Sequence, residues 1–135
     1  MDILFLLDTN TVSSYIADNP SQVRRRLTRV GLNSTAISAV TEAELRYGIE
    51  RNPAALRRRE SVEFFLNNAL ILPWDSSAAC TYGQLRADQE RKGRPLSVED
   101  LMIAAHALAL GLTLVTHDQV FAYVDGLKTE DWTVA

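Results

Sequence analysis

The feature that most constrains this fold is a series of short apolar runs that alternate with helical segments. The runs cover residues 2–7, 34–39, 69–74 and 112–116. Runs of this kind, apolar without an in–out alternation, are typical of parallel strands that are covered on both faces of their sheet. Parallel strands also need long crossovers, which the intervening helical segments supply. The sequence therefore predicts an α/β fold built on a parallel sheet.

Turn and cap residues mark the expected helices. Pro20 opens one of them, Asn52-Pro53 separates two others, and Gly93 and Gly111 each follow the end of one. The predicted helices cover residues 11–17, 20–30, 41–50, 54–68, 76–92 and 97–110. A short fifth strand is expected at residues 132–134. The sheet should therefore have four or five strands.

Length and composition place the chain among ordinary globular proteins. Its 135 residues fit one domain, and 47% of them are hydrophobic, which is enough for a core. The apolar run at residues 3–7 is too short for a signal peptide or a membrane span. Cys80 has no second cysteine with which to form an internal disulfide. We therefore expect a reducing cytoplasm as the location.

The net charge of −3 hides an uneven distribution. Residues 20–94 contain thirteen Lys or Arg and eight Asp or Glu, a local charge of +5, and the remainder contains one and nine, a local charge of −8. Twelve of the fourteen cations are arginine, which suits bidentate contact with phosphate. The clusters at 24–26 and 57–59 are compatible with phosphate binding and equally with solvated helix faces.

Four acidic residues occupy related places in the predicted fold. Asp8 and Asp118 each lie just past a strand, at residues 2–7 and 112–116. Glu44 and Asp100 each lie in the first turn of a predicted helix. In a parallel sheet, strand ends and the starts of the following helices share one edge, where ligands bind. The four carboxylates should therefore converge on one rim.

Each acid taken alone has a simpler explanation as a helix cap. Thr41-x-x-Glu44 and Ser97-x-x-Asp100 match the capping box, and an Asp after a strand is a common N-cap. The joint pattern favours a site instead, because like charges a few ångströms apart repel by about 4 kcal/mol per pair at an effective dielectric near 20. Such a cluster needs raised pKa values or a bound cation. Hard divalent ions such as Mg²⁺ take oxygen ligands of this kind.

The segments that hold these acids resemble the successive motifs of PIN-domain proteins. The residues that carry the resemblance are Leu6-Leu7-Asp8-Thr9-Asn10, Ser38-Ala39-Val40-Thr41-Glu42-Ala43-Glu44-Leu45-Arg46-Tyr47-Gly48, Asp100-Leu101-Met102-Ile103-Ala104-Ala105-His106-Ala107 and Leu114-Val115-Thr116-His117-Asp118. Gly126-Leu127 and Glu130-Asp131-Trp132 resemble the end of the VapC toxins within that family. The similarity runs in order over nearly the whole chain.

The resemblance implies a fold, an activity and partners. The fold is a three-layer α/β/α sandwich with a parallel sheet, here a single PIN domain over residues 1–135. The activity is that of a Mg²⁺- or Mn²⁺-dependent endoribonuclease, a hydrolase that cleaves RNA phosphodiester bonds. In prokaryotes such an enzyme is the toxin of a toxin–antitoxin pair. The implied partners are the RNA substrate, an inhibitory VapB-type antitoxin and a second copy of the chain in a homodimer.

The resemblance also implies site residues. The metal-binding and catalytic positions fall on Asp8, Glu44, Asp100 and Asp118, and the supporting polar positions fall on Thr9, Asn10 and Thr116. The stretch at residues 116–121 is one residue shorter than many VapC sequences and lacks their second acid. Asp118 therefore matches the family pattern least closely of the four.

A mechanism follows from these roles. One ion bound by Asp8 and Asp100, with Glu44 directly or through water, would activate a water for in-line attack on the phosphodiester. A second ion would rest on Asp118. The arginines would position the RNA backbone without reading its sequence. His106, in an Ala-rich helix, is expected to serve packing or to lie on the surface, and His117 is expected to be structural.

The expected antitoxin contacts are of two kinds. An arginine on an extended tail of the antitoxin could occupy the acidic pocket and displace the metal. Residues 54–70, with Leu56, Phe64, Phe65 and Leu66, are a candidate partner surface, although ordinary core packing explains the same residues.

Three other functions remain open from the sequence. The first is phosphoryl transfer through a covalent intermediate on Asp8, which is disfavoured because Asn10 stands where such enzymes usually have a second Asp and because Lys128 lies in the wrong segment. The second is a non-catalytic module with the same fold, which the intact set of acids disfavours. The third is cleavage of structured DNA, which differs only in substrate.

Overall fold

The computed structural model describes residues 2–17, 22–94 and 96–134. At its centre is a five-stranded sheet in the order β3-β2-β1-β4-β5, in which every pairing is parallel. The strands are β1 (Phe5–Leu7), β2 (Thr35–Ser38), β3 (Ile71–Leu72), β4 (Thr113–Val115) and β5 (Thr129–Glu130). The predicted parallel sheet is confirmed.

Neighbouring residues of the central strands enter two different cores. Leu6 of β1 belongs to a cluster with Leu114 of β4, whereas Leu7 belongs to a second cluster with Ile37 and Val115. Successive side chains of a strand point to opposite faces, so a strand buried on both faces is apolar throughout. This is the physical reason for the apolar runs in the sequence.

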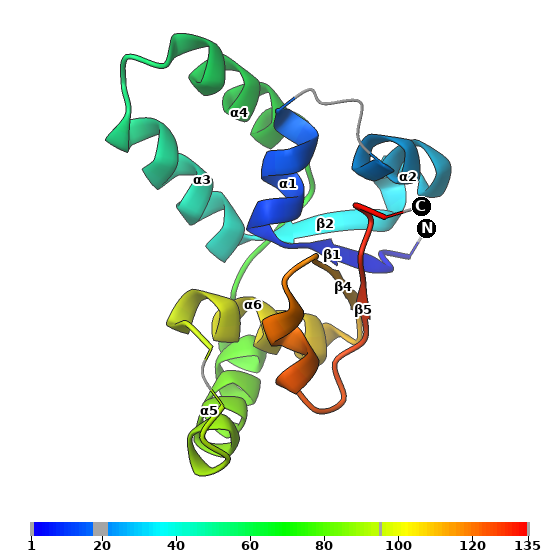
Figure 1. Cartoon of the computed structure of the whole chain (residues 1–135), viewed down its shortest axis with the longest axis vertical. Helices are drawn as coiled ribbons and strands as arrows, with labels where there is room; N and C mark the ends of the chain where they lie inside the picture. Colours follow the sequence, from blue (N-terminus) through cyan, green and yellow to red (C-terminus); the bar gives the residue numbers. More distant parts are fainter. Residues whose placement is uncertain (1, 18–21, 95, 135) are drawn as a thin grey trace.

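Helices cover both faces of the sheet (Figure 1). One layer contains α1 (Thr9–Ile16), α2 (Gln22–Val30), α3 (Ala39–Arg51) and α4 (Leu56–Asn68), and the other contains α5 (Ser76–Arg91) and α6 (Val98–Leu110). Two 3₁₀ helices complete the chain, η1 (Leu32–Ser34) and η2 (Gln119–Tyr123). The architecture is the predicted three-layer α/β/α sandwich. No helix within the described ranges combines the length and the apolar character that a membrane span requires.

Three local predictions need correction or fall outside the described residues. The fifth strand was expected at residues 132–134, but β5 is Thr129–Glu130, and Trp132 is instead a core side chain that is 1% exposed. The helix expected from Thr41 begins at Ala39, with Ser38 as its N-cap, so Glu44 lies in the second turn of α3 rather than the first. The helix start expected at Pro20 lies outside the described residues, and α2 is described from Gln22.

The strand order fixes where a ligand can bind. From β1 the chain builds β2 and β3 on one side of the sheet, and β4 and β5 are added on the other. Connections that leave adjacent strands in opposite directions open a crevice at the carboxyl ends of those strands. Here that crevice lies beyond the ends of β1 and β4, where the chain continues into Asp8 and Thr116.

Candidate active site

Asp8 is held rigidly at the end of β1. It is 3% exposed, and its backbone N–H donates to the Val115 carbonyl at 3.0 Å. Its carboxylate caps α1 by accepting the Thr11 N–H at 2.8 Å. Thr11 in turn donates its hydroxyl to the same Val115 carbonyl at 3.0 Å. The cap explanation of Asp8 is therefore correct, and it leaves the second carboxylate oxygen available for another contact.

Glu44 reaches the start of α1 from the neighbouring helix. The Thr9 hydroxyl donates to Oε1 of Glu44 at 2.5 Å, and Thr9 Oγ1 lies 3.2 Å from Thr41 Oγ1. Arg46, two residues further along α3, pairs with Glu42 and Glu63. Thr9 thus holds the Glu44 carboxylate in its orientation through this hydrogen bond.

Asp100 and Asp118 complete the rim. Asp100 lies in the first turn of α6, where its backbone N–H donates to the Ser97 hydroxyl at 3.1 Å. Asp118 caps η2 through the Val120 N–H at 3.0 Å, and its own N–H donates to the Thr116 hydroxyl at 3.0 Å. Thr116 therefore shapes the loop that carries Asp118.

The electrostatics connect the four predicted acids. Burial is the main cause that raises the pKa of Asp100, the hydrogen bond from Ser97 lowers it, and the charges of Asp118, Asp8 and Glu99 raise it further. Burial also raises the pKa of Glu44, the hydrogen bond from Thr9 lowers it, and the charges of Asp100, Glu99 and Asp8 raise it. The fold thus brings these carboxylates close enough to repel one another, as expected from the sheet topology.

The arrangement is not a preformed metal cage. Among the described residues, no three His, Cys, Asp or Glu side chains are placed so that they could all ligate one ion as they stand. Mg²⁺ commonly binds through one or two carboxylates and keeps several waters, so it does not need such a cage. Carboxylates placed in this way would suit a hydrated Mg²⁺ or Mn²⁺ that keeps several waters better than a fully dehydrated ion.

Two observations revise the predicted set of residues. Glu99 is a fifth acid whose charge acts on both Asp100 and Glu44, and its position beside Asp100 in the sequence was the signal that could have revealed it. Asn10 is exposed on the first turn of α1, and no hydrogen bond within the described residues joins it to the acids. Among the described residues, Asn10 therefore makes no hydrogen bond that supports the acids.

Several of the arginines have partners within the molecule. Arg26 lies 4.0 Å from the Glu130 carboxylate, and Arg59 pairs with Glu50 at 3.0 Å. Arg58 donates to the Ser13 hydroxyl at 3.3 Å. These contacts reduce the number of arginines that are free to hold a phosphate backbone.

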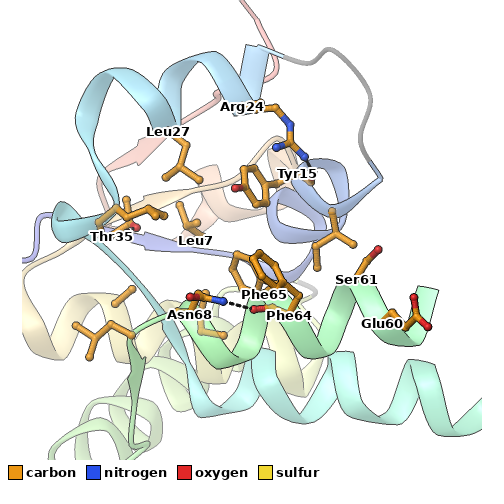
Figure 2. Close-up of a pocket in the computed structure, with 16 residues that line it drawn as sticks. Leu7, Tyr15, Arg24, Leu27, Thr35, Glu60, Ser61, Phe64, Phe65 and Asn68 are labelled. Carbon is orange, nitrogen blue, oxygen red and sulfur yellow. Dashed lines mark hydrogen bonds between the residues drawn. The ribbon is translucent and has the colours of Figure 1, made fainter. Parts of the chain in front are cut away.

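A separate apolar groove of 530 Å³ runs between α1, α2 and α4 (Figure 2). Phe64 lines it and is 73% exposed, and Tyr15 and Leu27 face it from the other helices. The candidate partner surface at residues 54–70 therefore divides in two. Phe64 is available to a partner, whereas Leu66 is 5% exposed and belongs to the core.

The chain is similar to known proteins over almost its whole length. The family model described as "PIN domain" matches residues 5–127. A protein named "tRNA(fMet)-specific endonuclease VapC" from Shigella flexneri is 40% identical over 130 residues, which are 96% of this chain and 98% of that protein. A protein named "Ribonuclease VapC2" from Rickettsia felis is 35% identical over 134 residues, 96% of this chain and 98% of that one.

A solved structure supports the same conclusion. The DNA-bound VapBC complex from Salmonella typhimurium contains a chain with a TM-score of 0.89 and 38% sequence identity, and the match covers 96% of this chain and 98% of that one. Together with the sheet order and the four acids, these matches define the class of protein. The chain belongs to the PIN domain family, and within it to the VapC proteins.

Proposed function

We propose that this protein is an endoribonuclease that hydrolyses RNA phosphodiester bonds with the help of Mg²⁺ or Mn²⁺, and that it acts as the toxin of a VapBC-type pair. The observation that carries the proposal is the electrostatic coupling of Asp8, Glu44, Asp100 and Asp118 at the carboxyl edge of the sheet. The relatives named as a tRNA(fMet)-specific endonuclease and as a ribonuclease support RNA as the substrate. Cellular RNA is cytoplasmic in prokaryotes, and we expect the protein there.

Each acid has a role in the proposed reaction. Asp8 and Asp100, both fixed at the ends of elements, are the residues that would hold a divalent cation. When bound, that cation would supply an activated water and would neutralise charge on the leaving oxygen. Glu44, oriented by Thr9, would contact that ion directly or through a water, and its raised pKa suits its Oε2 to accept a proton from the attacking water. Asp118 closes the rim on the β4 side.

The test is an RNA cleavage assay with tRNA(fMet) as the first substrate, because the relative at 40% identity is named for it. The protein should cleave with Mg²⁺ or Mn²⁺ and stop when a chelator is added. Asp8→Asn and Asp100→Asn should remove activity and leave thermal unfolding unchanged or shifted upward. Asp75→Asn, which alters an acid that caps α5, is the matched control and should remain active. Full activity in Asp8→Asn or Asp100→Asn would contradict the proposed site.

We also propose that the apolar groove binds the antitoxin. Similar chains occur in solved VapBC complexes, which supports a VapB-type partner. Most residues that line the groove are apolar, and Arg24 and Glu60 are also among them, so it fits an amphipathic segment (Figure 2). An arginine further along that segment could compete with a cation for the carboxylates, which would account for inhibition. A homodimer is the expected state of the toxin in the complex.

Phe64→Asp tests the groove. A charge in place of this central aromatic side chain should raise the dissociation constant of the antitoxin complex by about 30-fold or more, equivalent to about 2 kcal/mol. Leu56→Asp on the same helix is the control, because Leu56 is 66% exposed but does not line the groove. The partner for the titration is the protein encoded by the small reading frame expected directly upstream. Equal affinity for Phe64→Asp and wild type would place the antitoxin elsewhere.

A further inference from the structure

A buried histidine links the two helices that carry Glu44 and Asp100. His106 of α6 is 2% exposed, and its Nδ1 lies 2.8 Å from the hydroxyl of Ser38, which is fully buried. The sequence suggested that this histidine serves packing or lies on the surface. The structure buries it, which agrees with packing and not with a surface position, and also gives it one defined hydrogen bond, to a residue 68 positions away.

Ser38 is a junction in the fold. It is the last residue of β2 and the N-cap of α3, where its hydroxyl oxygen accepts the Val40 N–H at 3.1 Å. A serine hydroxyl also has one proton to donate. Burial lowers the pKa of His106 and so favours the neutral ring, although the charge of Asp75 opposes this. In the tautomer that carries its proton on Nε2, Nδ1 accepts the Ser38 proton. Both hydrogen-bonding functions of Ser38 are then satisfied.

The bond lies between two arms of the candidate site. Glu44 follows Ser38 by six residues along α3, and Asp100 precedes His106 by six residues along α6. The charge of Asp100 is one of the causes that raise the pKa of Glu44, so the separation of the two helices affects both acids. Within the part of the chain that the structure describes, no other hydrogen bond between side chains joins α6 to α3 or its cap.

We propose that His106 is a positioning residue for the acidic site. Its bond to Ser38 fixes the start of α3 against α6 and so sets the spacing between Glu44 and Asp100. The inference rests on the proposed function in that the acids hold a divalent cation. Without the bond, the cap of α3 can shift, and the two carboxylates lose the spacing that suits an ion. Groups that hydrogen-bond directly to metal ligands typically change metal affinity by roughly 10- to 100-fold when they are replaced, and His106, which acts one step further away, is expected at the lower end of that range.

The test compares two substitutions at His106 with a matched change elsewhere. His106→Leu fills the space and removes the hydrogen bond, whereas His106→Asn keeps a polar atom near the place of Nδ1. Gln89→Leu on α5 is the control, because Gln89 is 1% exposed and its side-chain nitrogen and oxygen have no hydrogen-bond partner among the residues that the structure describes. It therefore makes the same polar-to-apolar change in a buried position without breaking a bond.

Mn²⁺ binding to the full chain is measured by calorimetry, and amide exchange at Val40 is measured in metal-free protein. We expect His106→Leu to bind Mn²⁺ roughly 10-fold more weakly, with faster exchange at Val40. We expect kcat for RNA to fall while KM stays nearly unchanged, because the bond does not touch the RNA. His106→Asn should recover most of the affinity, and Gln89→Leu should match wild type.

The outcomes separate this inference from the proposed function. If wild type binds Mn²⁺ and His106→Leu binds it equally well, the positioning role is overturned. If wild type does not bind Mn²⁺, the metal-dependent function is contradicted. Amide exchange at Val40 then tests whether His106 holds the start of α3. Unchanged exchange in His106→Leu would then show that His106 does not hold the start of α3, whereas faster exchange would support that it does.

Discussion

Asp100 and Glu44 have pKa values above their ordinary range because the fold buries them beside other acids. Between the ordinary value of about 4 and the raised value, the folded protein binds more protons than the unfolded chain. The contribution of these two carboxyl groups to the free energy of unfolding of metal-free protein should therefore fall as the pH rises through this window. Asp100→Asn should remove part of that fall. Urea unfolding in chelator from pH 4 to pH 7 measures it, and identical pH dependence in variant and wild type would contradict the raised pKa.

Thr9 provides a second test at the level of one side chain. Thr9→Val keeps the shape of the residue but removes the hydroxyl that donates to Glu44. Because that hydrogen bond lowers the pKa of Glu44, its loss should raise the pKa further and disfavour the charged form. We expect RNA cleavage to fall by about 10-fold, the lower end for groups that orient a metal ligand. Thr28→Val, which removes an exposed hydroxyl bound to the Arg24 carbonyl, should cleave normally.

Sequence reasoning found the acids but not their surroundings. Asp8, Asp100 and Asp118 lie at the strand ends and the helix start that the apolar pattern marks, whereas Glu44 lies one turn further into its helix than expected. The acid pair Glu99-Asp100 was readable as an adjacent charge, but its effect on Glu44 depends on how α3 and α6 pack. The bond between His106 and Ser38 was out of reach for the same reason, since nothing local relates two residues that lie 68 positions apart.

The start of α6 offers a prediction at the level of an element. The Ser97 hydroxyl accepts the Asp100 N–H and so satisfies one of the free donors in the first turn. Ser97→Ala should lower the free energy of unfolding by about 1 kcal/mol, the usual cost of a lost N-cap. It should also raise the pKa of Asp100, because the bond from Ser97 lowers that pKa. Denaturant unfolding with Ser97→Thr as a control checks the first effect, and equal stability of Ser97→Ala and wild type would contradict it.

Two element boundaries were misplaced for identifiable reasons. Thr41 and Glu44 match the capping-box sequence, but the N-cap of α3 is Ser38. Its hydroxyl accepts the Val40 N–H and is also hydrogen-bonded to His106. The fifth strand was expected at residues 132–134, which begin with Trp132. The ring of Trp132 packs in the core against Phe5. The pairing with β4 is made by the preceding residues Thr129–Glu130.

The fold class, an α/β fold with a parallel sheet, was predicted correctly from the sequence. Residues on both faces of each central strand are buried, so the apolar runs had a single simple explanation. The strand order could not be derived in the same way, because it depends on which crossovers cover which face. The groove between α1, α2 and α4 was also only half foreseen, since Phe64 and Leu66 are equally apolar in the sequence but only Phe64 is exposed.

The whole molecule should show two separable activities in cells. Expression of the wild-type chain should arrest growth, and Asp8→Asn should relieve the arrest. Co-expression of the upstream partner should relieve the arrest by wild type but not that by Phe64→Asp, because the groove and the acidic rim are different surfaces. Colony counts after induction measure this. If the partner also relieves the growth arrest caused by Phe64→Asp, the groove is not the docking surface.

The account depends most directly on a divalent cation bound among Asp8, Glu44, Asp100 and Asp118. A crystal of the protein soaked in Mn²⁺ and measured where manganese scatters anomalously locates the ion without reference to activity. We predict one strong anomalous peak between the carboxylates of Asp8 and Asp100, which disappears in crystals of Asp100→Asn. No peak at that rim, or a peak that persists in Asp100→Asn, would contradict the proposed site.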